Sequence, residues 1–340
     1  MTMNKIAMIG AGSWGTALAL LLARKGCPVV LWDRDRDHIE QLARERENKR
    51  YQPGHGFPEA LEVTAEISDA VKDAGCVVMV VPSHGYREVY RQIFPLLRDN
   101  ALVVSAVKGI EIESGMTMTG IMRAEGHDRN NIQLGVLSGP SFAAEVADRQ
   151  PTAVTVAFVD AHAAETVQHL FSTDYFRVYT SSDIIGLEIS AAMKNVIAIA
   201  AGICDGLNYG LNTRAALITR GLAEITRLGV ALGGEPQTFA GLGGLGDLVL
   251  TCTGNLSRNR TVGLKLGSGL TLEQALSEMK MVAEGVKTTK SCYKLAADLK
   301  VEMPILEQVY QVLYQNKRCE EAVSELFQRD LKQEAEVLAR

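Results

Sequence analysis

A lysine within a long apolar stretch is the residue of this chain best suited to acid–base chemistry. Lys194 stands in the middle of residues 187–204, which are apolar on most sides. Burial disfavours the charged form of an amine, so it moves the pKa toward the range useful for proton transfer. The alternative is a lysine whose stem follows the helix surface and whose charge stays in water. The sequence favours Lys194 as a general acid or base.

Two further segments carry groups that suit such a lysine and an anionic substrate. Asp247 follows the glycine-dense residues 241–246 and could balance the charge of a buried lysine, or it could cap the helix after it. Ser257, Arg258 and Asn259 gather hydrogen-bond donors, and the planar guanidinium of Arg258 suits bidentate capture of a phosphate. At a helix start these residues predict an anion site. The alternative is a capped surface helix with ordinary arginines.

Glycines near the start of the sequence predict a dinucleotide site. Gly10, Gly12 and Gly15 have the G-x-G-x-x-G spacing between an apolar run at 6–9 and a helical pattern at 14–25. The first glycine permits a tight turn, the second lets a phosphate approach the backbone, and the third lets the helix pack close to the strand. The free N–H groups of the helix start then suit a pyrophosphate. A glycine-rich turn in another kind of α/β protein is the alternative.

The residues after the second expected strand, at 29–32, bear on the choice of cofactor. Asp33 stands where a carboxylate binds the ribose 2′-hydroxyl of NAD, and Arg34 stands where a guanidinium can hold the 2′-phosphate of NADP. A solvated loop charge is the alternative for Arg34. We therefore expect both NAD and NADP to be accepted.

Strand and helix patterns alternate through the first half of the chain. Short strands are expected at 61–64, 76–82, 102–106, 132–138, 154–159 and 176–179, and a charged helix is expected over 37–50. This alternation predicts an α/β domain with a doubly wound parallel sheet, Rossmann-like, over residues 1–184. Ligands bind at the carboxyl ends of the strands in such sheets, where Lys108 and residues 139–142 lie.

Helical periodicity takes over in the second half. Residues 187–204 predict a central buried helix, and a second long helix is expected over 213–232. Residues 185–340 are therefore expected to form an all-α substrate and catalytic domain.

Composition excludes several classes of protein. The 340 residues suffice for two domains, and 47% hydrophobic with 22% charged residues argues against disorder. A net charge of −5 with scattered Lys and Arg argues against a nucleic-acid surface. The six cysteines lie far apart, so we expect reduced thiols, no metal site and a cytoplasmic location. No signal peptide and no membrane span are expected. The oligomeric state is left open, with a homodimer as one option.

Motifs spread over nearly the whole chain resemble the bacterial-type NAD(P)-dependent sn-glycerol-3-phosphate dehydrogenases. The resemblance rests on residues 10–17, 107–109, 138–143, 193–196, 240–253 and 257–259. It implies a small-molecule reaction, the interconversion of dihydroxyacetone phosphate and sn-glycerol 3-phosphate. The reduction direction would supply glycerophospholipid synthesis.

The resemblance also implies roles for particular residues. Lys194 would be the general acid/base, Asp247 would hold it in place, and Lys108 would contact both substrate and nicotinamide. The substrate pocket would comprise Lys108, Gly139, Ser141, Lys194, Asp247, Ser257, Arg258 and Asn259. The cofactor site would comprise Gly10, Gly12, Ser13, Trp14, Gly15, Asp33, Arg34, Lys108, Ala143, Arg258, Val282 and Glu284. Many relatives carry threonine in place of Ser141 and tyrosine or phenylalanine in place of Trp14, and both exchanges keep the chemistry.

Two other functions stay open at the level of sequence. A related two-domain β-hydroxyacid dehydrogenase would hold a carboxylate at Arg258. A non-catalytic redox sensor that binds NAD(H) would have no need of a lysine in an apolar helix, so Lys194 counts against it.

Overall fold

The chain folds into two compact units. The computed structural model describes residues 5–126, 131–279, 283–331 and 333–334. The first unit comprises Met1–Val107 and Met118–Ile184, and the second comprises Lys108–Thr117 and Ile185–Arg340. The expected division at 184/185 therefore differs from the observed one in the short segment 108–117.

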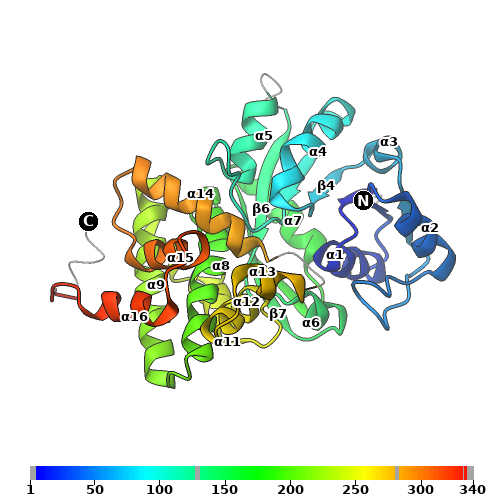
Figure 1. Cartoon of the computed structure of the whole chain (residues 1–340). Coiled ribbons are helices and arrows are strands. Elements are labelled where there is room, and N and C mark those ends of the chain that lie inside the picture. Colours follow the sequence, from blue (N-terminus) through cyan, green and yellow to red (C-terminus); the bar gives the residue numbers. More distant parts are fainter. Residues whose placement is uncertain (1–4, 127–130, 280–282, 332, 335–340) are drawn as a thin grey trace. The chain divides into compact units, whose positions relative to one another are not determined.

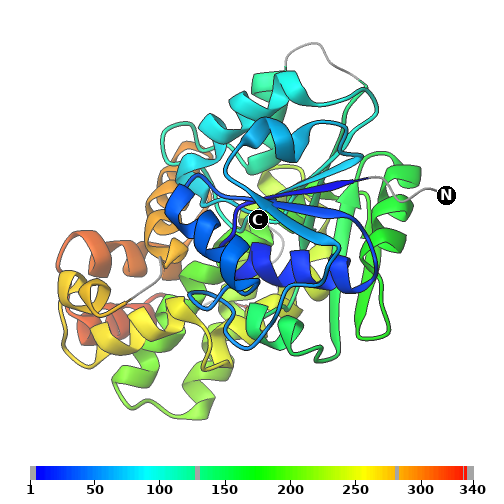
Figure 2. The same ribbon diagram turned by 90° about the vertical axis from the view of Figure 1, so that its right-hand side faces the viewer.

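An eight-stranded sheet organises the first unit, in the order β3-β2-β1-β4-β5-β6-β7-β8. Figures 1 and 2 show the strands as arrows from two directions. Its strands are β1 (Ile6–Ile9), β2 (Val29–Trp32), β3 (Leu61–Thr64), β4 (Cys76–Met79), β5 (Leu102–Ser105), β6 (Gln133–Ser138), β7 (Thr152–Phe158) and β8 (Phe176–Ser181). All neighbours run parallel except β6 and β7, which are antiparallel. The link between those two strands holds only the short helix α6 (Ala143–Ala147), which packs beside α1 and does not cross the sheet. The fully parallel sheet expected from the sequence is thus corrected at this one pair.

Helices cover both faces of this sheet, as a doubly wound fold requires. Side chains alternate along a strand, so Met8 joins the core cluster that contains Leu18 of α1, whereas Ile9 joins a second cluster with Tyr90 of α4. The remaining elements of this unit are α1 (Ser13–Arg24), α2 (Arg36–Glu45), α3 (Ile67–Val71), α4 (Tyr86–Ile93), α5 (Met118–Gly126), α7 (Ala161–Phe171) and the 3₁₀ turns Ser83–Gly85 and Phe94–Leu96. The Rossmann-like class expected from the sequence is confirmed.

The helix expected over 37–50 ends early, and the residues after it support the glycine turn. α2 stops at Glu45, because Arg46 adopts a left-handed conformation with φ 50°. Asn48 then lies fully buried, and its Nδ2 donates to the carbonyl oxygen of Ala11 at 2.9 Å and to Thr16 Oγ1 at 2.8 Å. Asn48 stands among charged residues in the sequence, so the pattern there does not show that the helix ends before it.

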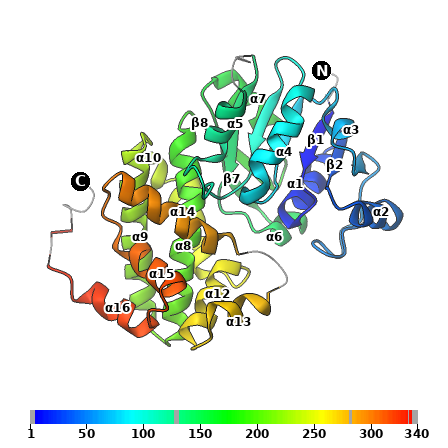
Figure 3. The ribbon, with the colours of Figure 1, turned by 45° about the horizontal axis from the view of Figure 1, so that its top comes forward.

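The second unit is helical among the residues that the structure describes, and α8 (Ile184–Gly206) lies among α9, α12, α14 and α15 (Figure 3). Its other elements are α9 (Leu211–Ala231), α10 (Pro236–Phe239), a π-helical turn (Leu242–Gly246), α11 (Asp247–Thr253), α12 (Arg258–Gly267), α13 (Leu272–Ser277), α14 (Glu284–Asp298), α15 (Pro304–Tyr314) and α16 (Cys319–Phe327). By length and composition alone α8 could cross a membrane, but 94% of its apolar window is buried within the protein. It is therefore the core helix of this unit.

Glycines bring α8 and α12 into backbone contact. A Cβ at Gly202 would lie 2.0 Å from the carbonyl oxygen of Arg260, and a Cβ at Gly263 would lie 1.9 Å from that of Ile199. Gly206 and Gly267 repeat this contact one turn further along each helix. Because the atoms in the way belong to the backbone, no side-chain movement could relieve the overlap. The separation of the two helices is thus set by residues without side chains.

The segment 108–117 belongs to the second unit because its side chains find partners there. Ile110 is part of the helical unit's hydrophobic core, and its carbonyl oxygen accepts a hydrogen bond from Ser291 Oγ of α14 at 3.2 Å. An antiparallel bridge between Ile110 and Thr117 closes the segment into a loop. As a result Lys108, which follows β5 in the sequence, is held by the helical unit.

Candidate active site

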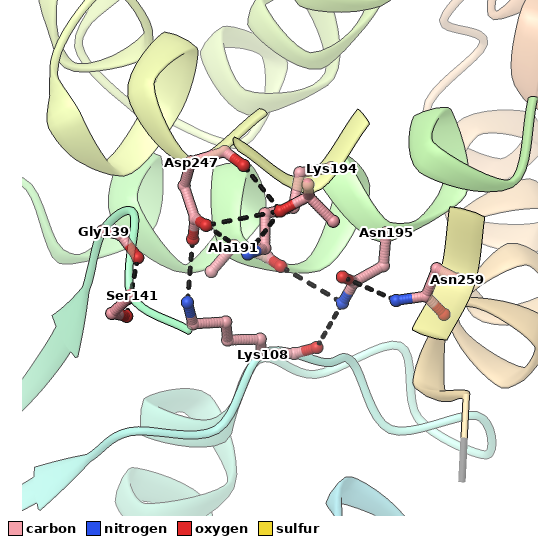
Figure 4. Close-up of polar contacts among 9 residues, drawn as sticks. Lys108, Gly139, Ser141, Ala191, Lys194, Asn195, Asp247 and Asn259 are labelled. Atoms are coloured by element: carbon pink, nitrogen blue, oxygen red, sulfur yellow. Dashed lines mark hydrogen bonds and ion pairs between the residues drawn. The ribbon is translucent and has the colours of Figure 1, made fainter. Parts of the chain in front are cut away.

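Lys194 lies buried on α8 and makes an ion pair with Asp247 (Figure 4). Its Nζ donates to Asp247 Oδ1 and, at 3.0 Å, to Thr251 Oγ1. Lys194 is 5% exposed and Asp247 is 1% exposed, so neither charge is solvated. The side chain does not run out to solvent along the helix, which removes that alternative. A buried, paired lysine is the form that can exchange a proton with a bound ligand.

The local fold explains why Asp247 reaches Lys194. The π-helical turn before α11 packs tightly, since a Cβ at Gly243 would meet Leu187 Cδ1 of α8 at 1.9 Å and one at Gly244 would meet the Phe239 carbonyl oxygen at 2.0 Å. Asp247 then begins α11, and Thr251 follows one turn later on the same face. The helix is capped by Gly246, so the capping role considered for Asp247 is not the one the structure gives it.

Lys108 completes a three-membered charge cluster. Its Nζ contacts Asp247 Oδ2 at 2.9 Å, so one carboxylate faces two ammonium groups (Figure 4). Burial lowers the pKa of Lys194 to about 7; the Asp247 carboxylate opposes this shift, and the Lys108 charge adds to it. Near neutral pH, Lys194 is therefore populated both with and without its proton. While Lys194 holds its proton, the three groups carry two positive charges and one negative charge, which favours an anionic ligand or a negative charge that develops during reaction.

A chain of amides links this cluster to the start of α12. Asn195 Nδ2 donates to the carbonyl oxygen of Lys108 at 3.1 Å, and Asn259 Nδ2 donates to Asn195 Oδ1 at 2.9 Å (Figure 4). Asn259 Oδ1 in turn accepts from the backbone N–H of Gly285 at 2.9 Å. Each of these amides has defined donor and acceptor partners, so the backbone around Lys108 and the first turn of α12 are held together.

The start of α12 combines a helix cap with an exposed arginine. Ser257 is the N-cap, and its Oγ accepts from the backbone N–H of Arg260 at 3.2 Å. Ser257 and Asn259 are buried, whereas Arg258 between them is exposed. The structure therefore confirms the helix cap that the alternative proposed. It does not exclude an anion site, because a helix N-terminus and a guanidinium stand side by side there.

The glycine turn of the first unit has the form that a pyrophosphate requires. Gly10 has φ +122°, and a Cβ at Gly15 would lie 1.9 Å from the Gly10 carbonyl oxygen. By contrast, a Cβ at Gly12 would have no neighbour within 4 Å among the described residues. Gly12 is also the N-cap of α1 and brings no side chain to that helix end. These features leave room and backbone donors for a phosphate, so the residues present fit a dinucleotide.

Asp33 is tied to this turn, and Arg34 is not. Asp33 Oδ2 accepts from the backbone N–H of Ala11 at 3.0 Å, and its Oδ1 accepts from that of Asp35 at 3.1 Å. Arg34 is exposed. A carboxylate therefore stands at the glycine turn, with an exposed cation next to it in sequence.

The other predicted site residues are distributed over both units. In the first, Ser13 Oγ donates to the Tyr51 carbonyl oxygen at 3.3 Å, and Trp14 is half-buried with no partner for its Nε1 among the described residues. Gly139 has φ +151°, Ser141 Oγ donates to its carbonyl oxygen at 2.9 Å, and Ala143 begins α6. In the second unit, Glu284 begins α14. Val282 lies outside the described residues.

Sequence reasoning missed three residues that support the site. Thr251 contacts Lys194, Asn195 links Lys108 to α12, and Asn48 holds the glycine turn. The i+4 spacing of Thr251 after Asp247 was the one signal available for it. Within the part of the chain that is described, no group of three or more His, Cys, Asp or Glu residues could hold a metal ion.

A doubly wound unit with an open glycine turn and a helical unit with a buried Lys–Asp pair define a two-domain dehydrogenase of the NAD(P)-dependent class. Two family models agree with this. The N-terminal model of NAD-dependent glycerol-3-phosphate dehydrogenase matches residues 5–164, and its C-terminal model matches residues 183–324. The chain belongs to the NAD-dependent glycerol-3-phosphate dehydrogenase family.

Individual relatives resemble the chain over almost its whole length. A glycerol-3-phosphate dehydrogenase (NAD(P)+) of Desulfotalea psychrophila is 60% identical and covers 97% of this chain and 98% of the relative. That of Citrifermentans bemidjiense is 56% identical, covering 97% and 99%. The crystal structure of glycerol-3-phosphate dehydrogenase from Coxiella burnetii is 40% identical, covers 96% and 99%, and superimposes with a TM-score of 0.92.

Proposed function

We propose that this chain reduces dihydroxyacetone phosphate to sn-glycerol 3-phosphate with NADH or NADPH, and that it also catalyses the reverse reaction. The observation that carries the proposal is the buried Lys194–Asp247–Lys108 cluster, in which the pKa of Lys194 is about 7. The names of the relatives support the choice of substrate. The reaction would supply the glycerol phosphate backbone of glycerophospholipids in the cytoplasm.

Each residue of the cluster has a distinct task in this proposal. When bound, the nicotinamide supplies a hydride in reduction and accepts one in oxidation. Lys194 gives its proton to the oxygen on substrate C2 during reduction and removes it during oxidation. Lys108 stabilises negative charge on that oxygen, and Asp247 keeps Lys194 charged often enough to act as an acid.

The two units divide the binding tasks. We assign residues 1–184, apart from 108–117, to the dinucleotide, through Gly10, Gly12, Gly15 and the other cofactor residues of that unit. Residues 108–117 and 185–340 carry the catalytic and substrate site. The phosphate of the substrate is assigned to Ser257, Arg258 and Asn259, with Gly139 and Ser141 as further lining residues. Lys108, Arg258, Val282 and Glu284 are assigned to the cofactor as well, and assembly as a homodimer without membrane insertion belongs to the same proposal.

A steady-state assay tests this function directly. Purified protein should oxidise NADH and NADPH in the presence of dihydroxyacetone phosphate, and should do so far more slowly with 2- or 3-keto carboxylic acids. Preference for a keto acid would assign the chain to the β-hydroxyacid dehydrogenases. Cofactor binding without turnover of any substrate would point to a sensor.

The glycine turn yields a prediction that separates folding from cofactor binding. Gly12→Ala should leave the free energy of unfolding within about 0.5 kcal/mol of the original, because a Cβ there meets nothing in the described protein. It should nevertheless weaken NADH and NADPH binding, since the methyl group occupies the space of a phosphate. Gly15→Ala should instead lower the free energy of unfolding by about 1–3 kcal/mol, because its Cβ overlaps backbone. Urea unfolding measures the free energy of unfolding of each variant, and fluorescence titration measures its affinity for NADH and NADPH. If Gly12→Ala bound the cofactors as tightly as the original protein, the phosphate would not bind at this turn.

A second prediction concerns the choice between the two cofactors. Arg34→Ala should weaken NADPH binding by about 1.5–3 kcal/mol, the range for hydrogen bonds to charged groups, and leave NADH binding nearly unchanged. Arg44→Ala, which removes an exposed arginine from the nearby helix α2, is the matched control. Titration of each variant with NADH and with NADPH measures the two binding affinities and so shows which role Arg34 has. Equal losses would assign Arg34 to adenine stacking, and no loss would leave it a solvated loop charge.

A further inference from the structure

Asp205, near the end of α8, binds two arginines and takes no part in the cluster around Lys194. Arg214 of α9 donates to Asp205 Oδ1, with its Nε at 3.1 Å, and Arg260 Nε donates to Asp205 Oδ2 at 2.7 Å. The side chain of Asp205 is 7% exposed, so the carboxylate is held away from water. A buried carboxylate with two guanidinium partners restricts both of them to one geometry.

Arg260 connects this carboxylate to the proposed phosphate site. Its backbone N–H donates to Ser257 Oγ at the helix cap. Its guanidinium reaches Asp205 on one side and, through Nη1 at 3.1 Å, Asn255 Oδ1 in the loop before the cap on the other. Arg260 therefore contacts both Ser257 and Asn255 in the loop before it, and Asp205 holds the Arg260 guanidinium.

The same helix that carries Lys194 carries Asp205. Asp205 follows Lys194 by eleven positions, which corresponds to about three turns and ~16 Å along α8. Between them, Gly202 brings α8 into contact with the backbone of α12 at Arg260. The ionic contact at Asp205 and the glycine contact at Gly202 thus bind the first turn of α12 to α8 at neighbouring points. Together they set where the anion donors stand relative to the proton donor.

We propose that Asp205 is a positioning residue for the substrate phosphate: acting through Arg260, it holds the first turn of α12 at the distance from Lys194 that dihydroxyacetone phosphate requires. This inference rests on the proposed function. Asp205 leaves one positive charge in its own cluster uncompensated, so it holds Arg260 in place without cancelling the positive field around the site.

The test compares two substrates that differ only in the phosphate. In Asp205→Asn, KM for dihydroxyacetone phosphate should rise by about tenfold to a hundredfold, the scale expected when a binding group is displaced by about 1 Å. The kcat/KM for dihydroxyacetone, which presents the same carbonyl without a phosphate, should stay within about twofold, because the proton donor is untouched. The pH dependence of kcat should keep its midpoint, since Lys194 keeps its neighbours.

Two further variants keep the outcome interpretable. Glu278→Gln removes the ion pair between Lys265 Nζ and Glu278 Oε2, 2.6 Å apart, at the opposite end of α12, and should leave KM for both substrates unchanged. Arg260→Lys keeps a positive charge beside Asp205 but loses the hydrogen bond to Asn255. It should raise KM for dihydroxyacetone phosphate and leave KM for dihydroxyacetone unchanged. This variant replaces Asp205→Asn in the test if Asp205→Asn does not fold. An equal loss for both substrates, or no loss for either, overturns the positioning role. If the unaltered protein does not reduce dihydroxyacetone phosphate, the proposed function itself is wrong.

Discussion

Lys194→Ala should lower kcat for reduction of dihydroxyacetone phosphate by about two to four orders of magnitude, the usual contribution of a positioned acid or base. The side chain lies buried beside Asp247, with Thr251 as a further partner, and α8 carries no second lysine that could replace it. Binding of NADH and NADPH should change little, because the glycine turn belongs to the other unit.

The pH dependence provides a second readout for the same residue. Because the pKa of Lys194 is about 7, the charged form declines as the pH rises through 7. Reduction needs the charged form, so kcat/KM for reduction should fall across this range. Oxidation needs the neutral form, so kcat/KM for oxidation should rise across it. Both slopes should be absent from the residual activity of Lys194→Ala.

Lys317→Ala is a suitable control for this experiment. Lys317 is also a mostly buried lysine of the helical unit, paired with Glu325 at 2.5 Å, and it lies outside the proposed site. Its replacement should leave kcat and both pH profiles unchanged. Near-normal kcat in Lys194→Ala would take that residue out of the mechanism.

Asp247→Asn should reduce both activity and stability, because it removes the carboxylate that pairs with both Lys194 and Lys108. Breaking a buried ion pair by removing one partner costs about 3–5 kcal/mol. We expect a value near the lower end, ~3 kcal/mol, since Lys194 can release its proton and avoid a buried charge. The kcat for reduction should fall by about a hundredfold, because fewer molecules then hold Lys194 in its acid form.

The direction of the pH shift makes this prediction specific. Asp247 raises the pKa of Lys194 against the effect of burial. Without the carboxylate, the pH midpoint of kcat/KM for reduction should move downward by about one to three units, the usual effect of a nearby opposite charge. Urea unfolding at pH 7 and pH–rate profiles measure the two effects. Glu325→Gln, which breaks the pair with Lys317, is the control; an upward shift or an unchanged midpoint in Asp247→Asn would contradict the proposed coupling.

Local sequence patterns determined much of the secondary structure. β1, β2 and β3 occupy the ranges 6–9, 29–32 and 61–64 that the sequence predicts. Thr271 and Gln274, three residues apart, form a capping box at the start of α13, and Pro304 stands in the first turn of α15. Burial, capping and proline geometry act over a few residues, so these features are readable from a short window of sequence.

Chain direction and domain membership were decided by tertiary contacts. The pattern of β7 is the same for parallel and antiparallel pairing, and only the path of the chain through α6 makes it antiparallel to β6. Likewise, Lys108 follows a strand of the first unit but belongs to the second, because Ile110 finds its apolar partners there. An apolar side chain in a sequence does not say which core it will enter.

The candidate site shows the same division between local and long-range information. The sequence alone singled out Lys194, because a charged residue in an apolar helix conflicts with its surroundings wherever the helix lies. It left Asp247 with two roles, and the contact of that carboxylate with Lys194 and Lys108, 53 and 139 residues away, decided between them. Asn48 and Asp205 carried no such signal, since a buried hydrogen bond depends on partners that only the folded chain brings within about 3 Å.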